Sequence, residues 1–115
     1  MKMIVAIIRP EKLEAVQAAL LEREVHLMTA TDVRGCGRQR GFTETFRVGA
    51  GVVRLLPKVK LEIAVNEDFV QPTVDAILEA GHSEGDRVGD GKIFVLPLEE
   101  VYRIRTGERG GVAIG

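Results

Sequence analysis

The sequence predicts an α+β domain with the ferredoxin-like order βαββαβ, in which two helices cover one face of an antiparallel sheet. Three observations lead to this class. Short runs rich in β-branched residues recur along the chain, two segments of helical period separate them, and most glycines fall in clusters outside these segments. With 115 residues, of which 45% are hydrophobic, the chain has the size and composition of a single domain over 1–115.

The first predicted elements are a strand and a surface helix. Residues 2–8 form a β-rich apolar run that ends at Arg9 and Pro10, and both faces of this strand are apolar. The hydrophobic period becomes helical over 11–23. The apolar side chains that share the inner face of this helix are Leu13, Val16, Ala19 and Leu20.

Two further strands are predicted in the middle of the chain. Residues 26–35 return to a β pattern, and residues 59–65 alternate cleanly between apolar and mostly polar side chains. The inner face of the second of these strands carries Val59, Leu61, Ile63 and Val65.

A second helix and two extended segments complete the order. The helix begins near Asp68, has Pro72 in its first turn and ends at Gly81, which we expect to form a left-handed C-cap. Residues 92–98 form the next strand, and residues 101–105 a small terminal strand. The predicted inward side chains of the helix are Val70, Val74, Ile77 and Leu78.

The uncovered face of this sheet predicts self-association. Two helices cover only one face, yet the first strand and residues 93–96 are apolar on both faces. A closed homo-oligomer would bury the second face most simply. The alternative is a monomer that keeps a partly apolar open sheet.

The connection between the second and third strands is long. Residues 36–56 contain four glycines and four arginines and have no steady period. Connections of this length are usually functional or disordered, so we expect a mobile arm whose order depends on a ligand or a partner. The alternative is a long, twisted β-ribbon, because "TETFRV" and "GVVRLL" have some strand character.

Charge and cysteine content narrow the possible functions. The chain has 16 Lys and Arg against 17 Asp and Glu, which argues against general nucleic-acid binding and requires any basic site to be local. Cys36 is the single cysteine and the two histidines are isolated, so neither an internal disulfide nor a zinc pattern is present. The N-terminal apolar run is too short for a signal peptide or a membrane span. A reducing, cytoplasmic setting fits these features.

The segment "GDGK" suits phosphate. Gly89 and Gly91 allow the backbone to approach a ligand with its amides pointing outward, and Lys92 adds a positive charge. It is not a Walker A loop, because no Gly-x-x-x-x-Gly precedes the lysine and a strand follows it. The structural alternative is a pair of turn glycines before a strand.

Two other segments add polar groups. Arg103 and Arg105 are two apart in a predicted extended segment, so both guanidinium groups should leave one face as a clamp for a polyphosphate; the alternative is a solvated edge strand. In "GCGRQRG", three glycines allow a turn, and Arg38 and Gln39 offer hydrogen-bond donors and an amide oxygen. The spacing of the glycines is not Gly-x-Gly-x-x-Gly, which excludes a Rossmann motif. Lys58 can reach back toward the base of the long connection.

Together, these segments resemble the PII family of nitrogen-regulatory signal proteins, the group that includes regulators of ammonium channels. The opening "MKMIVAIIRPEKL" is similar to the family's first strand and helix, "GCGRQRGFTE" to its loop entry and "LLPKVKLEI" to its loop exit. "GDGKIFV" and "RIRTGE" resemble its closing motifs. The resemblance covers nearly the whole chain, with the motifs collinear and compatibly spaced.

The resemblance implies a trimer of ferredoxin-like subunits that bind ATP or ADP in the clefts between subunits. Arg103 and Arg105 would arrive from the neighbouring subunit, and Ala64 is smaller than the usual valine. The nucleotide-binding positions that it implies are Ile7, Thr29, Gly35, Cys36, Gly37, Arg38, Gln39, Ala64, Gly89, Asp90, Gly91, Lys92, Arg103 and Arg105.

The resemblance also implies an effector and a target. Mg²⁺-ATP would permit 2-oxoglutarate to bind, with Gln39 helping to hold Mg²⁺. The implied 2-oxoglutarate positions are Gln39, Arg40, Gly41 and Lys58. The long connection corresponds to the family's flexible T-loop, residues 37–55, and Arg47 to the arginine that enters the cytoplasmic mouth of an ammonium channel. The protein would then be cytoplasmic and recruited to the inner face of the membrane by its target.

Departures from the family's pattern concern regulation. Gly51 replaces the tyrosine that many members uridylylate, and Gly49 replaces a serine that others phosphorylate, so neither modification is available. Two alternatives to a sensor that responds to 2-oxoglutarate stay open. One is a nucleotide-binding adaptor that has lost this response and acts on another transporter or biosynthetic enzyme. The other is a slow ATPase, although no carboxylate pair or nucleophile-histidine set accompanies the phosphate motifs.

Overall fold

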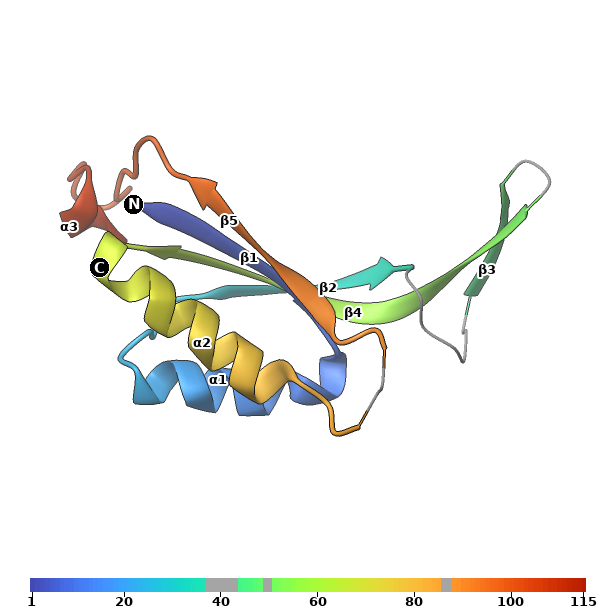
Figure 1. Ribbon diagram of the computed structural model, residues 1–115. Coiled ribbons are helices and arrows are strands. Elements are labelled where there is room, and N and C mark those ends of the chain that lie inside the picture. The colour runs from blue at the N-terminus through green and yellow to red at the C-terminus, as the bar shows by residue number, and fades with distance from the viewer. Residues whose placement is uncertain (37–43, 49–50, 86–87) are drawn as a thin grey trace.

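The computed structural model shows an antiparallel sheet with two helices packed on one face (Figure 1). The structure describes residues 1–36, 44–48, 51–85 and 88–115, with the backbone alone at 44–48 and 51–54. Its strands run in the order β2-β4-β1-β5, and β3 pairs with the first part of β4. The elements are β1 (Lys2–Ile8), α1 (Leu13–Glu22), β2 (Thr29–Gly35), β3 (Glu44–Val48), β4 (Gly51–Val65), α2 (Val70–Gly81), β5 (Gly91–Pro97) and α3 (Gly111–Ile114).

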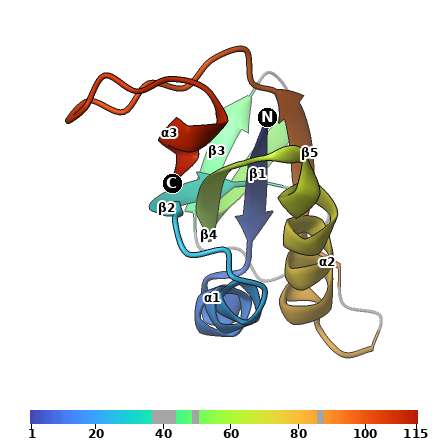
Figure 2. The same cartoon turned by 90° about the vertical axis from the view of Figure 1, so that its left-hand side faces the viewer.

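The predicted ferredoxin-like arrangement is confirmed by this strand order and by the position of the helices. β1 lies in the centre, antiparallel to β4 on one side and to β5 on the other. Helices α1 and α2 lie together on one side of the sheet (Figure 2). The predicted inner face of residues 59–65 is correct, and of the two apolar faces of β1 the one with Ile4, Ala6 and Ile8 faces the helices. The core comprises Ile4, Ala6, Ile8, Val16, Leu20, Val25, Val59, Leu61, Ile63, Val65, Ala76 and Ile77.

The second helix differs from its prediction in two places. Leu78 is exposed, whereas Thr73 is buried and donates its Oγ1 hydrogen to the Phe69 carbonyl at 2.6 Å. Gly81 is the last residue of α2 and is not left-handed; the helix ends because His82 is extended, with φ −76° and ψ 133°. Gly81 is buried, and a Cβ there would make an ordinary van der Waals contact of 3.8 Å with Cγ2 of Val16.

The second strand begins at Thr29 and not at residue 26. The chain leaves α1 through a turn in which Glu24 has a positive φ of 61° and Val25 donates its N–H to the Leu20 carbonyl at 2.9 Å. This turn buries Val25, and residues 26–28, which the β pattern assigned to the strand, follow it without regular structure.

The long connection contains paired strands. β3 pairs with β4 from Glu44↔Leu55 to Val48↔Gly51, and β4 then continues without a break into the sheet. The ribbon alternative therefore holds for residues 44–48 and 51–56, where strand pairing forms the backbone hydrogen bonds despite the glycines and arginines. The expected mobility of this arm, and its dependence on a ligand or partner, stay a prediction. The remaining positions of the connection, 37–43 and 49–50, lie outside the described residues.

The segment 101–105 was wrongly predicted as a strand. Tyr102 forms an isolated bridge with Arg109, and residues 104–106 form a turn that is closed by the Gly107 N–H to the Arg103 carbonyl at 2.8 Å. Gly107 permits this turn because its φ is 72°. Arg103 and Arg105 therefore do not leave one face of a strand.

The face of the sheet opposite the helices is open and partly apolar, as predicted. Met3, Val5 and Ile7 of β1 are half-buried there, and register places Phe94 and Leu96 of β5 on the same face, where both are exposed. Among the described helices, none is both long and apolar enough to cross a membrane.

Candidate functional site

A cavity of about 820 Å³ lies at one end of the sheet, on its open face. Because β1 and β5 are antiparallel, the last residues of β1 meet the first residues of β5, and Ile7 pairs with Lys92. The end of β2 and Lys58 of β4 complete the walls. The residues that line the cavity are Ile7, Val33, Arg34, Gly35, Cys36, Lys58, Gly89, Asp90, Gly91, Lys92 and Phe94.

Two glycines shape the loop that borders this cavity. Gly89 and Gly91 have φ values of 92° and 101°, in the region that L side chains rarely adopt. A Cβ on Gly91 would overlap the Ile7 carbonyl, so the close approach of the loop to β1 requires glycine. Gly91 thus allows the loop to pack against β1, and the approach of this backbone to a ligand stays a prediction.

Lys58 connects β4 to the glycine loop. Its ammonium is largely buried and donates to the Gly89 carbonyl at 2.6 Å. Burial lowers the pKa of Lys58, and the charge of Arg9 lowers it further, while Glu11 and Asp90 act in the opposite direction. Lys58 thus contacts the loop before β5, and it lines the cavity together with Gly35 and Cys36, where the long connection begins.

The side chain of Asp90 points away from the cavity. Its Oδ1 accepts a hydrogen bond from Nε of Arg9 at 2.9 Å, and its Oδ2 accepts the Ser83 N–H at 2.9 Å and lies 3.4 Å from Nδ1 of His82. Burial alone would raise the pKa of Asp90, but the hydrogen bonds from Ser83 and Arg9 and the charge of Arg9 together lower it well below its usual range.

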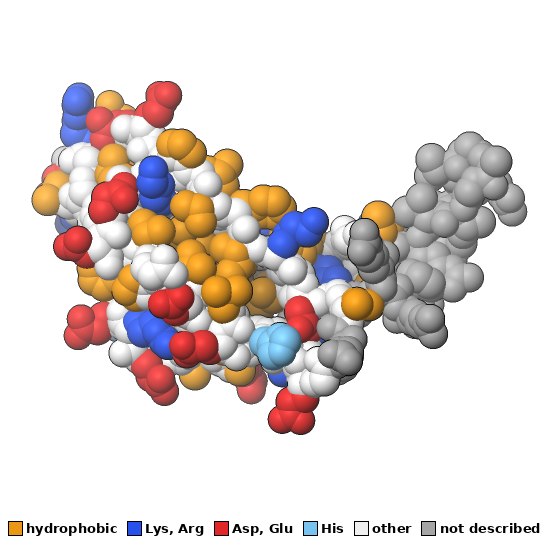
Figure 3. All heavy atoms as spheres, in the orientation of Figure 1, with side chains coloured by type: hydrophobic (Ala, Val, Ile, Leu, Met, Phe, Trp, Pro, Cys, Tyr) orange, Lys and Arg blue, Asp and Glu red, His pale blue; other side chains and the backbone are white. Residues whose placement is uncertain are grey.

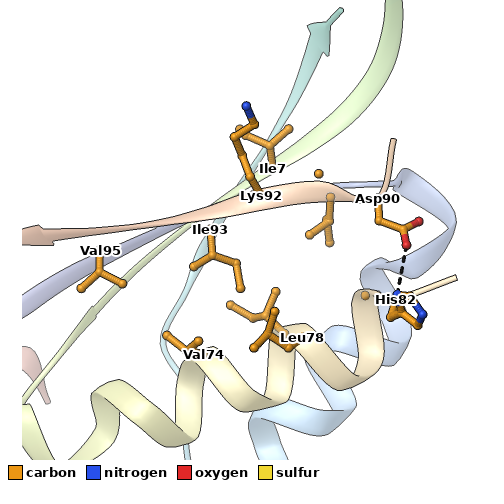
Figure 4. A pocket seen from close by; sticks show the side chains of 12 residues that line it. Ile7, Val74, Leu78, His82, Asp90, Lys92, Ile93 and Val95 are labelled. Carbon is orange, nitrogen blue, oxygen red and sulfur yellow. Dashed lines mark ion pairs between the residues drawn. The ribbon is translucent and has the colours of Figure 1, made fainter. Parts of the chain in front are cut away.

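Lys92 lies on the cavity side of β5. In Figure 4 its side chain and that of Ile7 leave the ribbon on one side, while Ile93 and the Asp90 carboxylate lie on the other. A cavity bordered by this ammonium and by the backbone of a glycine loop suits an anion such as phosphate.

A groove on the opposite side of β5 is largely apolar. It has a volume of about 480 Å³ and lies between β5 and α2, with His82 and Asp90 at one end (Figure 4). Hydrophobic side chains gather between these elements in Figure 3. Its apolar lining includes Val74, Ile77, Leu78, Ile93 and Val95. β5 therefore lies between a largely apolar groove and the cavity that Lys58 borders, and its Lys92 borders both.

Thr29 and Ala64 line a separate hollow on the open face, toward the Met3 end of β1. This hollow has a volume of about 290 Å³ and is also lined by Met3, Leu27, Met28 and Glu62. The strands place it on the same face as the cavity, since Thr29 pairs with Glu62 and Met3 with Ala64.

The two C-terminal arginines lie far from the cavity within one chain. They follow the Pro97 end of β5, whereas the cavity lies at its Gly91 end (Figure 1). The Arg103 guanidinium donates to Oε1 of Glu108 at 2.6 Å and to the Val112 carbonyl at 2.8 Å. A single chain therefore does not bring Arg103 or Arg105 to the glycine loop.

Several predicted site residues lie outside the described part of the chain. These are Gly37, Arg38, Gln39, Arg40 and Gly41. Arg47 lies in β3, where only the backbone is described. Within the described residues, no group of three or more His, Cys, Asp or Glu side chains could hold a metal ion. The Mg²⁺ position predicted at Gln39 stays a prediction.

Sequence reasoning missed four residues of this region. Val33, Arg34 and Phe94 line the cavity, and Arg9 anchors its loop. Phe94 could have been found because it lies two residues after Lys92 and so shares its face. Arg9 could have been found because it follows β1 at the sheet end where the glycine loop precedes β5.

Comparison with known proteins identifies the family. A family model described as "Nitrogen regulatory protein P-II" matches residues 1–108. The chain is 53% identical to "Nitrogen regulatory protein P-II 2" of Methanothermobacter thermautotrophicus over 114 residues, covering 99% of this chain and 97% of that protein. It is 51% identical to "Nitrogen regulatory protein P-II" of Azospirillum brasilense, covering 99% and 100%, and 48% identical to "Nitrogen regulatory protein GlnK1" of Methanosarcina mazei, covering 99% and 97%. The chain belongs to the P-II nitrogen regulatory protein family.

Proposed function

We propose that this nitrogen regulatory signal protein binds ATP or ADP in the cavity beside the glycine loop and reports the bound state to a target protein. The observation that supports this most directly is the composition of the cavity wall. Residues predicted to hold a nucleotide come together there from three strands, β1, β2 and β5, and from the loops that adjoin β2 and β5: Ile7, Gly35, Cys36, Gly89, Asp90, Gly91 and Lys92.

The electrostatics of the cavity favour a polyphosphate. Lys92 and Lys58 border it, and the Asp90 carboxylate is paired with Arg9 on the far side of the loop. The adenine ring would lie toward the hollow with Thr29 and Ala64 on the same face of the sheet. Mg²⁺, which keeps oxygen ligands from phosphates and water, would take the amide oxygen of Gln39 and neutralise phosphate charge.

We also propose that the functional unit is a trimer. The open face of the sheet carries exposed Phe94 and Leu96, and a second copy would bury them. Arg103 and Arg105 lie beyond the opposite end of β5 from the cavity, so they can serve as phosphate ligands only in the cavity of another copy. Self-association would therefore complete the site as well as cover the sheet.

Lys58 is the proposed contact for 2-oxoglutarate. Its ammonium lies at the cavity, where a dicarboxylate bound next to Mg²⁺-ATP would find a positive charge. Gln39, Arg40 and Gly41 would supply the remaining contacts. Binding of this effector would then require Mg²⁺-ATP, because the nucleotide and its ion form part of the effector's site.

The proposed output is the T-loop, residues 37–55. Ligands change its populated conformations by their differential affinity, a coupling of about 1–3 kcal/mol. The favoured target is an ammonium channel, with Arg47 at the pore mouth, so the protein would act in the cytoplasm and at the inner face of the membrane. ADP should favour this complex, and Mg²⁺-ATP with 2-oxoglutarate should release it.

Calorimetric titration tests the ligand assignments. ATP and ADP should each produce binding heat, and 2-oxoglutarate should produce heat only when Mg²⁺-ATP is present; the mass in solution should be that of a trimer. A monomer, or a protein without heat for either nucleotide, would overturn the proposal. Nucleotide binding without an effector response would favour the adaptor, and turnover well above about 1 per second would favour an enzyme.

A further inference from the structure

We infer that Arg9 is a positioning residue for the nucleotide loop, residues 88–91, which it holds through Asp90 and the Val88 carbonyl. The inference rests on the proposed binding of nucleotide in the adjacent cavity. Arg9 itself does not line that cavity, so it would act on the ligand only through the loop.

The placement of Arg9 favours an anchoring role. The residue directly follows β1 and is 4% exposed, which is unusual for a guanidinium unless its charge is paired. Its Nε donates to Oδ1 of Asp90 at 2.9 Å, and its Nη2 donates to the Val88 carbonyl. A single planar group therefore holds the loop on both sides of Gly89, a geometry that the ammonium of a lysine cannot reproduce.

The direction of the Asp90 side chain supports the same role. Figure 4 shows its carboxylate turned toward His82, on the side of β5 that faces α2, while Lys92 points to the other side. A carboxylate facing a phosphate would repel it. With its charge turned away and paired with Arg9, Asp90 can sit inside a phosphate-binding loop without opposing the ligand.

The two glycines make such an anchor necessary. Gly89 and Gly91 both have positive φ, and glycine has more accessible backbone conformations than any other residue. A loop with two such residues would have to be ordered when the ligand binds, at a cost in affinity. Arg9 orders it beforehand through its bonds to Asp90 and the Val88 carbonyl.

Other charged groups surround this anchor. Glu11 lies 3.9 Å from Nη1 of Arg9, and His82 lies 3.4 Å from Asp90. Lys58 holds the loop from the cavity side, through the Gly89 carbonyl. If Lys58 turns to an effector carboxylate, the Arg9 anchor still holds the loop, so loss of Arg9 should weaken nucleotide binding with or without 2-oxoglutarate.

The test compares nucleotide affinity across four single variants and one double variant of the full-length protein. Arg9→Met removes the anchor, Arg9→Lys keeps the charge without the planar fork, and Asp90→Asn removes the partner charge. Arg23→Met is the matched control, because it breaks another Arg–carboxylate pair, at 2.6 Å to Glu79, between α1 and α2. The dissociation constants of Mg²⁺-ATP and ADP are measured by calorimetry at a temperature well below each variant's Tm.

Arg9→Met and Asp90→Asn should weaken both nucleotides by about tenfold or more, comparable to the loss of a supporting hydrogen bond around a metal ligand. Arg9→Lys should lie between them and the wild type, and Arg23→Met should match the wild type. The double variant Arg9→Met with Asp90→Asn should bind no more weakly than either single variant, because both remove the same anchor. In NMR spectra without ligand, the amide signals of Gly89 and Gly91 should move in the Arg9 variants and stay in place in Arg23→Met.

Two outcomes separate the failure of this inference from that of the proposed function. If the wild type binds nucleotide and the folded Arg9→Lys and Asp90→Asn variants bind equally well, Arg9 is not a positioning residue. If the wild type itself binds neither ATP nor ADP, the proposed function fails. Should Arg9→Met not fold, the two milder variants and their amide signals decide the question.

Discussion

The two ends of the sheet use the same kind of ion pair in different surroundings. Beside the cavity, Nε of Arg9 lies 2.9 Å from Asp90, and their side chains are 5% and 22% exposed. In the C-terminal segment, Nη1 of Arg103 lies 2.6 Å from Glu108, with side chains 31% and 45% exposed. The second contact is shorter, yet water screens it more. Burial, rather than distance, should decide which pair the fold depends on.

Two glycines, one beside the cavity and one in the C-terminal segment, also differ in their surroundings. Gly91 beside the cavity and Gly107 in the C-terminal turn both have positive φ, at 101° and 72°. A Cβ at Gly91 would overlap the Ile7 carbonyl, whereas a Cβ at Gly107 would have no atom within 4 Å. One position therefore requires glycine for its conformation and for space, and the other for its conformation alone.

The largest effect is expected for Gly91→Ala. The substitution forces β5 away from β1 and places an L side chain at positive φ, so the free energy of unfolding should fall by more than about 4 kcal/mol, a loss that few single changes reach. Gly107→Ala is the matched control and should cost about 1–2 kcal/mol, the conformational term alone. Urea denaturation measures both. Equal losses at the two positions would contradict the contrast between the ends.

Arg9→Met should have the next largest effect on stability. It leaves the Asp90 carboxylate without its buried partner, and breaking such a pair typically costs about 3–5 kcal/mol. Asp90 is partly exposed, which places the expectation at the lower limit, about 3 kcal/mol. The midpoint of urea denaturation should fall accordingly. A loss below that of Gly107→Ala would show that the cavity end does not depend on this pair.

A pH series isolates the contribution of Asp90. The pKa of this carboxyl is lower in the folded protein than in the unfolded chain, so its stabilisation is complete above the unfolded pKa of about 4 and is lost as the pH falls toward the folded pKa. Asp90→Asn lacks this titration. The difference in unfolding free energy between wild type and Asp90→Asn should be constant above about pH 5 and should shrink below about pH 4, by at most about 1.4 kcal/mol per pH unit. A difference that stays constant down to about pH 3 would contradict the role of this charge.

Arg103→Met should change stability least. Its exposed pair with Glu108 is expected to contribute within about 1 kcal/mol. Under the proposed function this arginine also completes the nucleotide site of another subunit, so its substitution should weaken ATP binding while the midpoint of urea denaturation hardly moves. If the variant binds ATP with wild-type affinity, Arg103 is not part of the proposed site. A large loss of stability would contradict the difference between the two ends of the sheet.

Much of the fold could be predicted because the spacing of hydrophobic residues along the chain differs between helices and strands. The alternation of Val59, Leu61, Ile63 and Val65 has one structural solution, a strand with one buried face, and the structure has it. The prediction failed where local patterns are ambiguous. Segment 101–105 has strand-like composition, but Gly107 allows a turn that reverses the chain, and the exposure of Leu78 depends on how far the sheet extends beneath α2.

The candidate site was predicted only in part for the same reason. The segment "GDGK" predicts a loop whose amides could bind phosphate. The structure places this loop at a cavity together with Gly35 and Lys58. The sequence does not tell which way Asp90 points. That direction depends on Arg9, 81 residues earlier in the chain, and on the meeting of β1 and β5 at one end of the sheet.

The sequence by itself determined the strand and helix pattern, the apolar face left uncovered by the helices, and the residue types of a phosphate-binding loop, because these properties depend on side-chain chemistry and on spacing along the chain. Only the tertiary structure decided which of these residues share a cavity, that the Asp90 carboxylate faces Arg9, and that Arg103 and Arg105 lie beyond the far end of β5. These facts depend on contacts between segments far apart in sequence, which no local pattern encodes.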